Sequence, residues 1–335
     1  MELCSMKCLL IQTAFIGDVV LATPLVEKLH RFFPGARIDM LVRKGNEKLL
    51  DQHPHLNKVL AWDKKQRKYA SLFQLLRAIR RERYDLLVNC QRFAASGILT
   101  AFSGAAQTVG FDKNPFSFLF SRSIAHQIGD GRHEVQRNLD LIRHLTDDTI
   151  ERPRLYPSRA DYGYAQELAG NQTYFCLAPT SVWFTKQLPA RQWVKLIALL
   201  PADARVFLLG GPGDREACEA IARAADRPNI VNTAGQLSFL QSAALMQGAR
   251  RNFVNDSAPL HFASAVNAPV TAFFCSTVPA FGFTPLSDDS LVVETTRQLD
   301  CRPCGLHGFK ACPKGHFDCA ESLDVFAAFP KQPAA

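Results

Sequence analysis

Hydrophobic residues occur along this chain in short continuous runs that alternate with longer segments of helical periodicity. In the first half, the runs at residues 8–11, 37–42 and 85–89 predict buried strands, because a strand covered on both faces is apolar at consecutive positions. Apolar residues spaced three and four apart predict helices at residues 19–33 and 72–83. This alternation predicts a parallel sheet with helices on both faces.

The pattern restarts after residues 147–159, a polar stretch that contains Pro153 and Pro157. We interpret this stretch as a linker, and we expect an N-terminal domain at residues 1–155 and a C-terminal domain at residues 156–335. The chain is therefore expected to form two successive α/β sheets of similar size, with a ligand in the cleft between them. Further strands are expected at residues 58–60, 108–111, 174–178, 206–209, 230–231, 252–254 and 270–274, and further helices at residues 96–103, 133–145, 190–200, 217–225, 239–247, 259–266 and 322–329.

The composition is that of a globular protein, since 47% of the 335 residues are hydrophobic and 21% are charged. The net charge of +8 favours anionic partners, a class that includes nucleotide phosphates, an anionic membrane surface and nucleic acid. Residues 257–287 carry no Lys, Arg, Asp or Glu, but four prolines interrupt them. We therefore expect a buried helix and a buried strand there, and no membrane-spanning helix.

The N-terminus and the cysteines bear on the cellular compartment. No basic segment precedes a long apolar run at the N-terminus, so we expect no signal peptide. Six of the ten cysteines are scattered in apolar segments, as small core residues usually are. Reduced, buried thiols are typical of a cytoplasmic protein, and we expect this chain to be one.

One candidate binding site is the polar turn after the strand expected at residues 252–254. Asn255, Asp256 and Ser257 lead from this strand into a helix that has Pro259 in its first turn. A helix N-terminus leaves backbone N–H groups without intrahelical partners, and such groups bind phosphate. An ordinary strand-to-helix turn with ordinary caps explains the same residues, so both interpretations stay open.

A second candidate follows the first strand of the second half. Thr180, Ser181, Thr185 and Lys186 offer hydroxyl groups and one positive charge, which together suit a phosphate. A polar surface loop is the alternative. Residues 210–213 read Gly-Gly-Pro-Gly after the next strand, but they do not match the G-x-G-x-x-G pattern and do not favour a nicotinamide site.

A third candidate is Asp18, which lies where the loop after the first strand becomes a helix. Ligands of open α/β sheets bind at the carboxyl ends of the strands, so Asp18 is placed to act as a general base. A favourable charge in the first helical turn is the alternative role. Farther along, Arg132, His133 and Arg137 form either a solvated basic face or a surface for an anionic acceptor.

In combination, these residues resemble glycosyltransferase family 9, the ADP-heptose:lipopolysaccharide heptosyltransferases. Each matching motif is weak alone, but the motifs occur in the family's order and cover nearly the whole chain. The matching positions are Gly17-Asp18, residues 185–189 (Thr-Lys-Gln-Leu-Pro), Gly210-Gly211 with Asp214 and Glu216, Ala234-Gly235, Asn255-Asp256-Ser257 with His261, and Phe283-Thr284-Pro285.

The resemblance implies a GT-B fold, in which two Rossmann-like domains with parallel sheets face a central cleft. It implies an inverting, metal-independent transfer of heptose from ADP-heptose to the inner core of lipopolysaccharide, with no cofactor required for catalysis. It further implies an acceptor-side first domain, peripheral contact with the cytoplasmic face of the inner membrane, and no nucleic-acid partner. In this scheme Asp18 is the general base, and the donor nucleotide sugar is bound by Thr180, Ser181, Thr185, Lys186, Gly210, Asp256, Ser257 and His261.

Two positions depart from the family pattern. The family usually has Gly after the Asp-Ser pair, whereas this chain has Ala258 and then Pro259, which removes one backbone N–H. After the strand at residues 270–274 the family often has Gly, whereas this chain has Cys-Ser-Thr at residues 275–277. A transferase of the same fold that uses another nucleotide sugar or acceptor therefore stays open. A non-catalytic basic module that binds nucleic acid is disfavoured, because the basic residues are spread along the chain, apart from the run from Arg77 to Arg83.

The C-terminal region contains a cluster of four cysteines: Cys301, Cys304, Cys312 and Cys319. Their spacing is compatible with one structural Zn or Fe ion, and some family members carry a similar tail. The second half of the cluster lacks the C-x-x-C spacing, so reduced thiols or disulfides remain the alternative.

Overall fold

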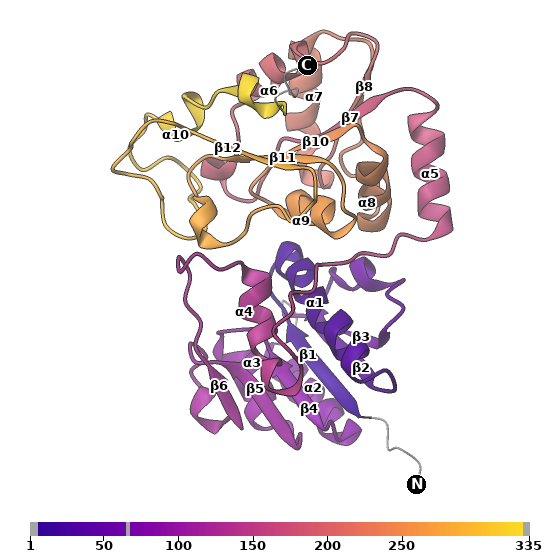
Figure 1. The fold of residues 1–335 in the computed structure, drawn as a ribbon, viewed down its shortest axis with the longest axis vertical. Coiled ribbons are helices and arrows are strands. Elements are labelled where there is room, and N and C mark those ends of the chain that lie inside the picture. The colour runs from indigo at the N-terminus through magenta and orange to yellow at the C-terminus, as the bar shows by residue number, and fades with distance from the viewer. Residues whose placement is uncertain (1–5, 65–67, 331–335) are drawn as a thin grey trace. The chain divides into compact units, whose positions relative to one another are not determined.

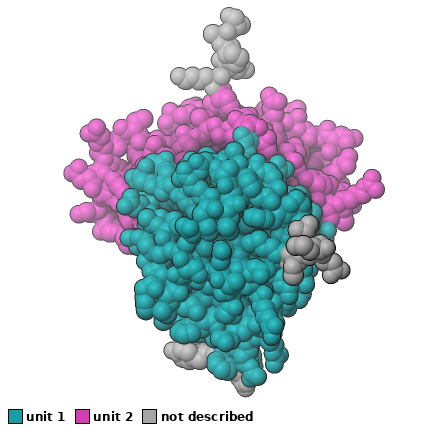
Figure 2. Space-filling view, turned by 60° about the horizontal axis from the view of Figure 1, so that its bottom comes forward, with its two compact units in different colours: residues 1–156 teal, residues 157–335 magenta. Residues whose placement is uncertain are grey.

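The computed structural model describes residues 6–64 and 68–330. The chain divides into two compact units, residues 1–156 (unit 1) and residues 157–335 (unit 2), which Figure 2 colours separately. Residues 1–5, on which the expectation of no signal peptide partly rests, lie outside the described part of the chain. No helix among the described residues is long and apolar enough to cross a membrane.

Unit 1 is built on a six-stranded sheet in which every strand pair is parallel. The strand order is β3-β2-β1-β4-β5-β6, so the chain reverses its direction of travel across the sheet between β1 and β4. The central strands are buried along almost their whole length, as their continuous apolar sequences predict. The strands are β1 Lys7–Gln12, β2 Arg37–Arg43, β3 Leu56–Trp62, β4 Leu86–Asn89, β5 Gln107–Phe111 and β6 Arg122–Ile124.

Two helical layers cover this sheet. One layer consists of α1 (Ile16–Phe32) and α4 (Glu134–Asp140). The other layer consists of α2 (Lys68–Glu82) and α3 (Ala94–Ala101). Right-handed crossovers place the two layers on opposite faces. Each large apolar side chain that is fully buried contributes about 1.5–3 kcal/mol to the stability of such a layer. Under α2 and α3 the buried core contains Leu9, Ile11, Leu41, Trp62, Ile79, Tyr84, Leu87 and Leu99. Short 3-10 turns are η1 Glu47–Leu50, η2 Ser117–Leu119 and η3 Arg143–Leu145.

Unit 2 repeats the arrangement with a second all-parallel sheet of order β12-β11-β10-β7-β8-β9. Figure 1 shows α6 and α7 on one side of this sheet and α8 and α9 on the other. The strands are β7 Tyr174–Ala178, β8 Arg205–Leu208, β9 Ile230–Asn232, β10 Arg251–Asn255, β11 Val270–Phe274 and β12 Ser290–Glu294. The helices are α5 Arg159–Ala169, α6 Ala190–Ala198, α7 Arg215–Ala225, α8 Phe239–Gly248, α9 Ala258–Ala265 and α10 Asp318–Glu321, with 3-10 turns η4 Phe184–Lys186, η5 Pro212–Asp214, η6 Pro279–Phe281 and η7 Val325–Ala328.

The C-terminal segment is part of the core of unit 2. Phe317, Cys319, Leu323 and Val325 are buried in the same cluster as Trp193 of α6. The Thr271 hydroxyl in β11 also donates a buried hydrogen bond of 2.8 Å to the carbonyl of Ala328. The tail therefore covers the α6 side of the sheet and is not an appendage.

The predicted α/β fold with two parallel sheets is confirmed, but several element predictions are wrong. The helix expected at residues 133–145 ends at Asp140, and a separate 3-10 turn follows it. The helix expected at residues 322–329 is replaced by α10 and η7. Helix α5 was not predicted because it buries only Ala165 and Ala169 and so has no strong apolar stripe; its start is fixed by a capping box between Ser158 and Asp161. The edge strands β6 and β12 were not predicted either.

Candidate functional site

The candidate donor-binding residues of unit 2 follow the carboxyl ends of neighbouring strands. Strands β7 and β10 pair directly, and the order of the sheet reverses between them. In parallel sheets this reversal is where loops diverge and leave a ligand-binding crevice. The loop after β7 leads to Lys186, and β10 leads directly into Asp256. The topology therefore brings together two residues that are far apart in the sequence.

Lys186 and Asp256 form an ion pair at this edge. The Lys186 Nζ lies 2.6 Å from the Asp256 Oδ2, and the two side chains are only 15% and 6% exposed. The Thr277 hydroxyl, from the loop after β11, donates to the same oxygen at 2.6 Å. Little water screens a salt bridge that is this buried, so its two charges act strongly on each other and on any ligand that approaches them. The sequence marked residues 275–277 as a departure from the family pattern but did not identify Thr277 as a site residue.

A buried amide ties the two loops together. Asn255 is fully buried, and its Oδ1 accepts a hydrogen bond of 2.9 Å from the backbone N–H of Leu188. Its Nδ2 donates to the carbonyls of Ala178 and Pro179 at 3.4 and 2.9 Å. Asn255 thus fixes the start of the loop that carries Lys186 to the end of β10.

The N-terminus of α9 offers fewer donors than the sequence suggested. Ser257 occupies the N-cap position, but its side chain makes no capping hydrogen bond. Of the first three helical positions, Pro259 has no N–H, and the Leu260 N–H donates to the Ser257 carbonyl at 3.0 Å. The N-terminus of α9 therefore offers few free N–H groups, and Lys186 contributes a cationic side chain to this edge.

The other predicted donor residues are placed differently. Thr180 and Ser181 are half-buried in the loop after β7, and the Ser181 carbonyl accepts from Gln187 Nε2 at 2.7 Å. Gly210 follows β8, and a Cβ there would meet the Asp214 Cβ at 2.7 Å, which gives this glycine a packing role in the turn. His261 lies inside α9 and is only 6% exposed.

Thr185 connects the donor loop to the cysteine-rich tail. It is 1% exposed, and its hydroxyl accepts a hydrogen bond of 2.8 Å from the backbone N–H of Phe309. Thr185 therefore lies beneath the loop surface, whereas its neighbour Lys186 is 15% exposed in its side chain. The sequence grouped the two residues as ligand contacts, and in the structure they differ in burial and in hydrogen-bond partners.

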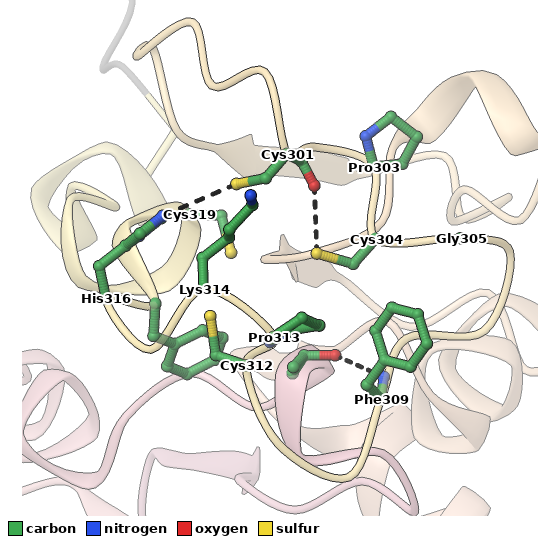
Figure 3. Close-up of a pocket in the computed structure, with 12 residues that line it drawn as sticks. Cys301, Pro303, Cys304, Gly305, Phe309, Cys312, Pro313, Lys314, His316 and Cys319 are labelled. Carbon is green, nitrogen blue, oxygen red and sulfur yellow. Dashed lines mark hydrogen bonds between the residues drawn. The ribbon is translucent and has the colours of Figure 1, made fainter.

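The four tail cysteines line one pocket of about 310 Å³ together with His316 (Figure 3). Within residues 6–64 and 68–330, no group of three or more His, Cys, Asp or Glu side chains is placed to hold a metal ion. The Cys304 thiol instead donates to the carbonyl of Cys301 at 3.2 Å, and the Cys301 sulfur lies 3.8 Å from the Nε2 of His316. The predicted four-cysteine Zn or Fe site is thus not supported by this arrangement.

In unit 1, Asp18 lies in the first turn of α1, at the carboxyl edge of the sheet. It is half-buried, and the loop before it follows β1. The order of this sheet reverses between β1 and β4, so Asp18 and Cys90 after β4 flank the reversal. Burial raises the pKa of the Cys90 thiol, and the negative charges of Glu134 and Asp18 raise it further. Asp18 and Cys90 therefore lie at the same carboxyl edge of the sheet.

Two side chains hold the loop before Asp18. The Lys64 ammonium donates to the Thr13 carbonyl at 2.9 Å, and the Asn46 amide donates to the Ala14 carbonyl at 3.2 Å. Burial, together with the charge of Arg43, lowers the pKa of Lys64 to about 8. The sequence did not identify Lys64; its one signal was a basic residue following β3.

The basic residues near α4 do not form a free anion-binding face. Arg137 is fully buried, and its Nε donates to Glu134 Oε2 at 2.8 Å. Burial alone would raise the pKa of Glu134, but the hydrogen bond and charge of His126 and the charge of Arg137 outweigh it, and the pKa of this carboxyl is lowered. His133 caps α4, and Arg132 pairs with Asp130 and Asp140.

The chain is similar to known proteins over most of its length. Residues 72–307 match the family described as glycosyltransferase family 9 (heptosyltransferase). A lipopolysaccharide heptosyltransferase 3 of Escherichia coli is 30% identical over 277 residues, which is 78% of this chain and 82% of the relative. A lipopolysaccharide heptosyltransferase 1 of Pseudomonas aeruginosa is 26% identical over 323 residues, 89% of this chain and 86% of the relative.

Solved structures share the fold. The E. coli ADP-heptose lps heptosyltransferase II superposes with a TM-score of 0.78 at 21% identity, covering 89% of this chain and 96% of that chain. The E. coli heptosyltransferase WaaC with ADP superposes with a TM-score of 0.68 at 20% identity, covering 86% and 92%.

Proposed function

Because the chain belongs to glycosyltransferase family 9, the heptosyltransferases, we propose that it transfers a heptose from ADP-heptose to the inner core of lipopolysaccharide. The observation that carries a diphosphate-linked donor is the Lys186 ammonium at the carboxyl edge of the second sheet, 2.6 Å from Asp256. A lysine paired with a single carboxylate can turn to a diphosphate, which offers more negative charge.

The proposed reaction is a direct displacement that inverts the anomeric carbon. Asp18 takes the proton from an acceptor hydroxyl as the oxygen attacks the anomeric carbon of the donor sugar. The bond from that carbon to the phosphate oxygen breaks, and ADP leaves with the bonding electrons. Lys186 stabilises the negative charge that develops on the leaving phosphate, which is the role a metal ion has in other transferases. We therefore propose that turnover continues in the presence of a chelator.

Product analysis tests this function. Purified protein is mixed with ADP-heptose and truncated lipopolysaccharide acceptors, with and without chelator, and the products are identified by mass spectrometry and by the configuration of the new linkage. One heptose should be added per acceptor with inversion. Transfer only from UDP-sugars would instead support the second candidate, a transferase of the same fold with another donor. Ala258 and Pro259 favour that candidate, because they alter the turn that the family builds around glycine.

We also propose peripheral contact with an anionic membrane surface through α2. Phe73 is 62% exposed on this helix, and Arg77 and Arg81 are exposed one and two turns farther along. The one acidic residue of the helix, Glu82, pairs with Lys58 at 3.0 Å. Exposed aromatic and basic side chains together favour anionic lipid headgroups.

Sedimentation with vesicles tests this contact. The protein should bind vesicles that contain anionic lipid and not zwitterionic vesicles, and the charge reversal R77E/R81E should abolish binding. Arg223→Glu on α7, which is also exposed, is the control and should leave binding unchanged. Equal binding of both variants would exclude α2 as the contact.

A further inference from the structure

The cysteine-rich tail reaches the residue next to Lys186. The pocket that the four cysteines line is also lined by Thr185 and Phe309 (Figure 3). Thr185 and Lys186 belong to η4, a single 3-10 turn of three residues. Such a turn has too few hydrogen bonds of its own to hold a long side chain in one direction. The loop therefore depends on its neighbours for its shape.

Every polar atom of Thr185 takes part in a hydrogen bond to a neighbouring backbone or side-chain group. Its N–H donates to the Phe309 carbonyl at 3.1 Å, and its hydroxyl accepts from the Phe309 N–H at 2.8 Å. Its carbonyl accepts from the Ser276 N–H at 3.2 Å, and its hydroxyl accepts from the Ser276 hydroxyl at 3.0 Å. The Cys304 N–H donates in turn to the Ser276 carbonyl at 2.9 Å. The tail, the loop after β11 and the donor loop are thus one connected network.

The backbone of the tail also touches the stem of Lys186. Gly308 has a φ of +76°, and a Cβ there would lie 2.8 Å from Thr185 Oγ1 and 3.4 Å from Lys186 Cγ. Only a glycine permits this approach with this backbone conformation. The Lys186 stem is therefore packed against residue 308, while its ammonium reaches Asp256.

We propose that residues 304–309 are a positioning strap for Lys186. The strap holds Thr185 in place and packs against the Lys186 stem, so that the ammonium points at the diphosphate of the donor without a loss of side-chain freedom on binding. Gly308, Phe309 and Thr185 touch no substrate in this scheme and act through Lys186. The inference rests on the proposed function, because it takes the diphosphate as the ligand of Lys186.

Two glycines of the tail provide a matched test. Gly315 has a φ of +77°, nearly the same as Gly308, but a Cβ there would meet nothing within 4 Å. Gly308→Ala and Gly315→Ala therefore carry a similar backbone strain, and only the first pushes into Thr185 and Lys186. We expect Gly308→Ala to weaken ADP binding by about tenfold in calorimetry and to lower kcat more than KM changes. Gly315→Ala should bind ADP as the unaltered protein does, with a similar loss in Tm.

A second pair keeps the inference testable if Gly308→Ala does not fold. Thr185→Val removes the hydroxyl at nearly constant volume, whereas Thr185→Ser keeps it. Thr185→Val should weaken ADP binding by about tenfold, whereas Thr185→Ser should bind ADP as tightly as the unaltered protein does. Thr295→Val is the control, since Thr295 bonds Ser322 in the same tail at 2.7 Å and the hydrogen bonds recorded for it do not involve the donor loop.

The outcomes separate the two proposals. If the unaltered protein does not bind ADP, the proposed donor is wrong and the strap falls with it. Suppose instead that the unaltered protein binds ADP. The positioning role alone is then overturned if Gly308→Ala and Thr185→Val bind ADP as tightly as the unaltered protein does. It is also overturned if the control variants Gly315→Ala and Thr295→Val lose as much ADP affinity as Gly308→Ala and Thr185→Val.

Discussion

The two units have the same strand order but differ in chemistry at the point where that order reverses. Counted from its first strand, each sheet runs 3-2-1-4-5-6, and each reversal lies between the first and fourth strands. Each fourth strand ends in a fully buried asparagine, Asn89 in unit 1 and Asn255 in unit 2. Near these matched positions unit 1 presents the carboxylate of Asp18, whereas unit 2 presents the ion pair of Lys186 with Asp256. The sheet thus sets where the polar groups lie, and the loops set which charges they carry.

The loops differ in how firmly they are held. Asn255 makes three hydrogen bonds that cross from β10 to the last residue of β7 and the loop that follows it. The Asn89 Oδ1 accepts from the Gln91 N–H, and its Nδ2 has no hydrogen-bond partner among the described residues. In unit 2 the tail adds the network around Thr185. A firmly held loop suits a group that must stabilise charge, because preorganised charges need no reorganisation during reaction.

The largest effect is expected from Asp18→Asn. Removing the general base should lower kcat by roughly two or more orders of magnitude, and ADP binding should barely change. Steady-state kinetics and calorimetry measure both. The control is Asp51→Asn, an exposed carboxylate of unit 1. Turnover near that of the unaltered protein in folded Asp18→Asn would refute the proposed role.

Lys186→Ala should weaken ADP binding by about 1.5–3 kcal/mol, the range for hydrogen bonds to charged groups. It should also slow the chemical step, because charge grows on the leaving phosphate. Lys195→Ala, an exposed lysine of α6, is the matched control. If Lys186→Ala binds ADP normally, or if Asp18→Asn loses binding instead, the roles given to the two units must be exchanged or abandoned.

The last comparison concerns the two asparagines, and the smallest effect is expected at Asn89. Asn255→Ala should lower the local stability around β7 and β10 by about 2–3 kcal/mol, since it removes three hydrogen bonds of about 1 kcal/mol each. Asn89→Ala should cost about 1 kcal/mol or less, because it also removes a buried donor without a partner. Hydrogen exchange of the backbone amides in β7 and β4 measures the opening of each site. Equal losses of local stability in the two variants would show that the loops at the two points where the strand order reverses are held equally firmly.

The sequence predicted well which residues lie at the ends of the strands, and it predicted poorly which side chains contact one another. Asp18, Lys186 and Asp256 could be chosen because each follows a buried apolar run, and parallel strands present their carboxyl ends at one edge. The ion pair between Lys186 and Asp256 could not be predicted, because it depends on β7 and β10 being neighbours in the sheet. Strand order is set by long-range packing that a local pattern does not encode.

The tail shows the same limit. The spacing of its cysteines suggested a metal site, but the positions of the side chains depend on turns at Gly305, Gly308 and Gly315, each of which has a positive φ. The apolar residues that follow the last of those turns, within residues 317–328, were not recognised as core, because their partners lie more than a hundred residues earlier, on α6. Local periodicity is uninformative where a segment has little regular structure of its own.

The packing of the tail also has a consequence for biosynthesis. Unit 1 ends at residue 156, so all of its sheet and helices have been synthesised before the second sheet begins. The core of unit 2 includes residues 317–328, so its hydrophobic cluster cannot be completed until these residues have left the ribosome. During that interval the apolar surface of α6 around Trp193 is uncovered and open to association with other nascent chains. The residues of the first unit are all available early, whereas the core of the second is completed only when residues 317–328 emerge.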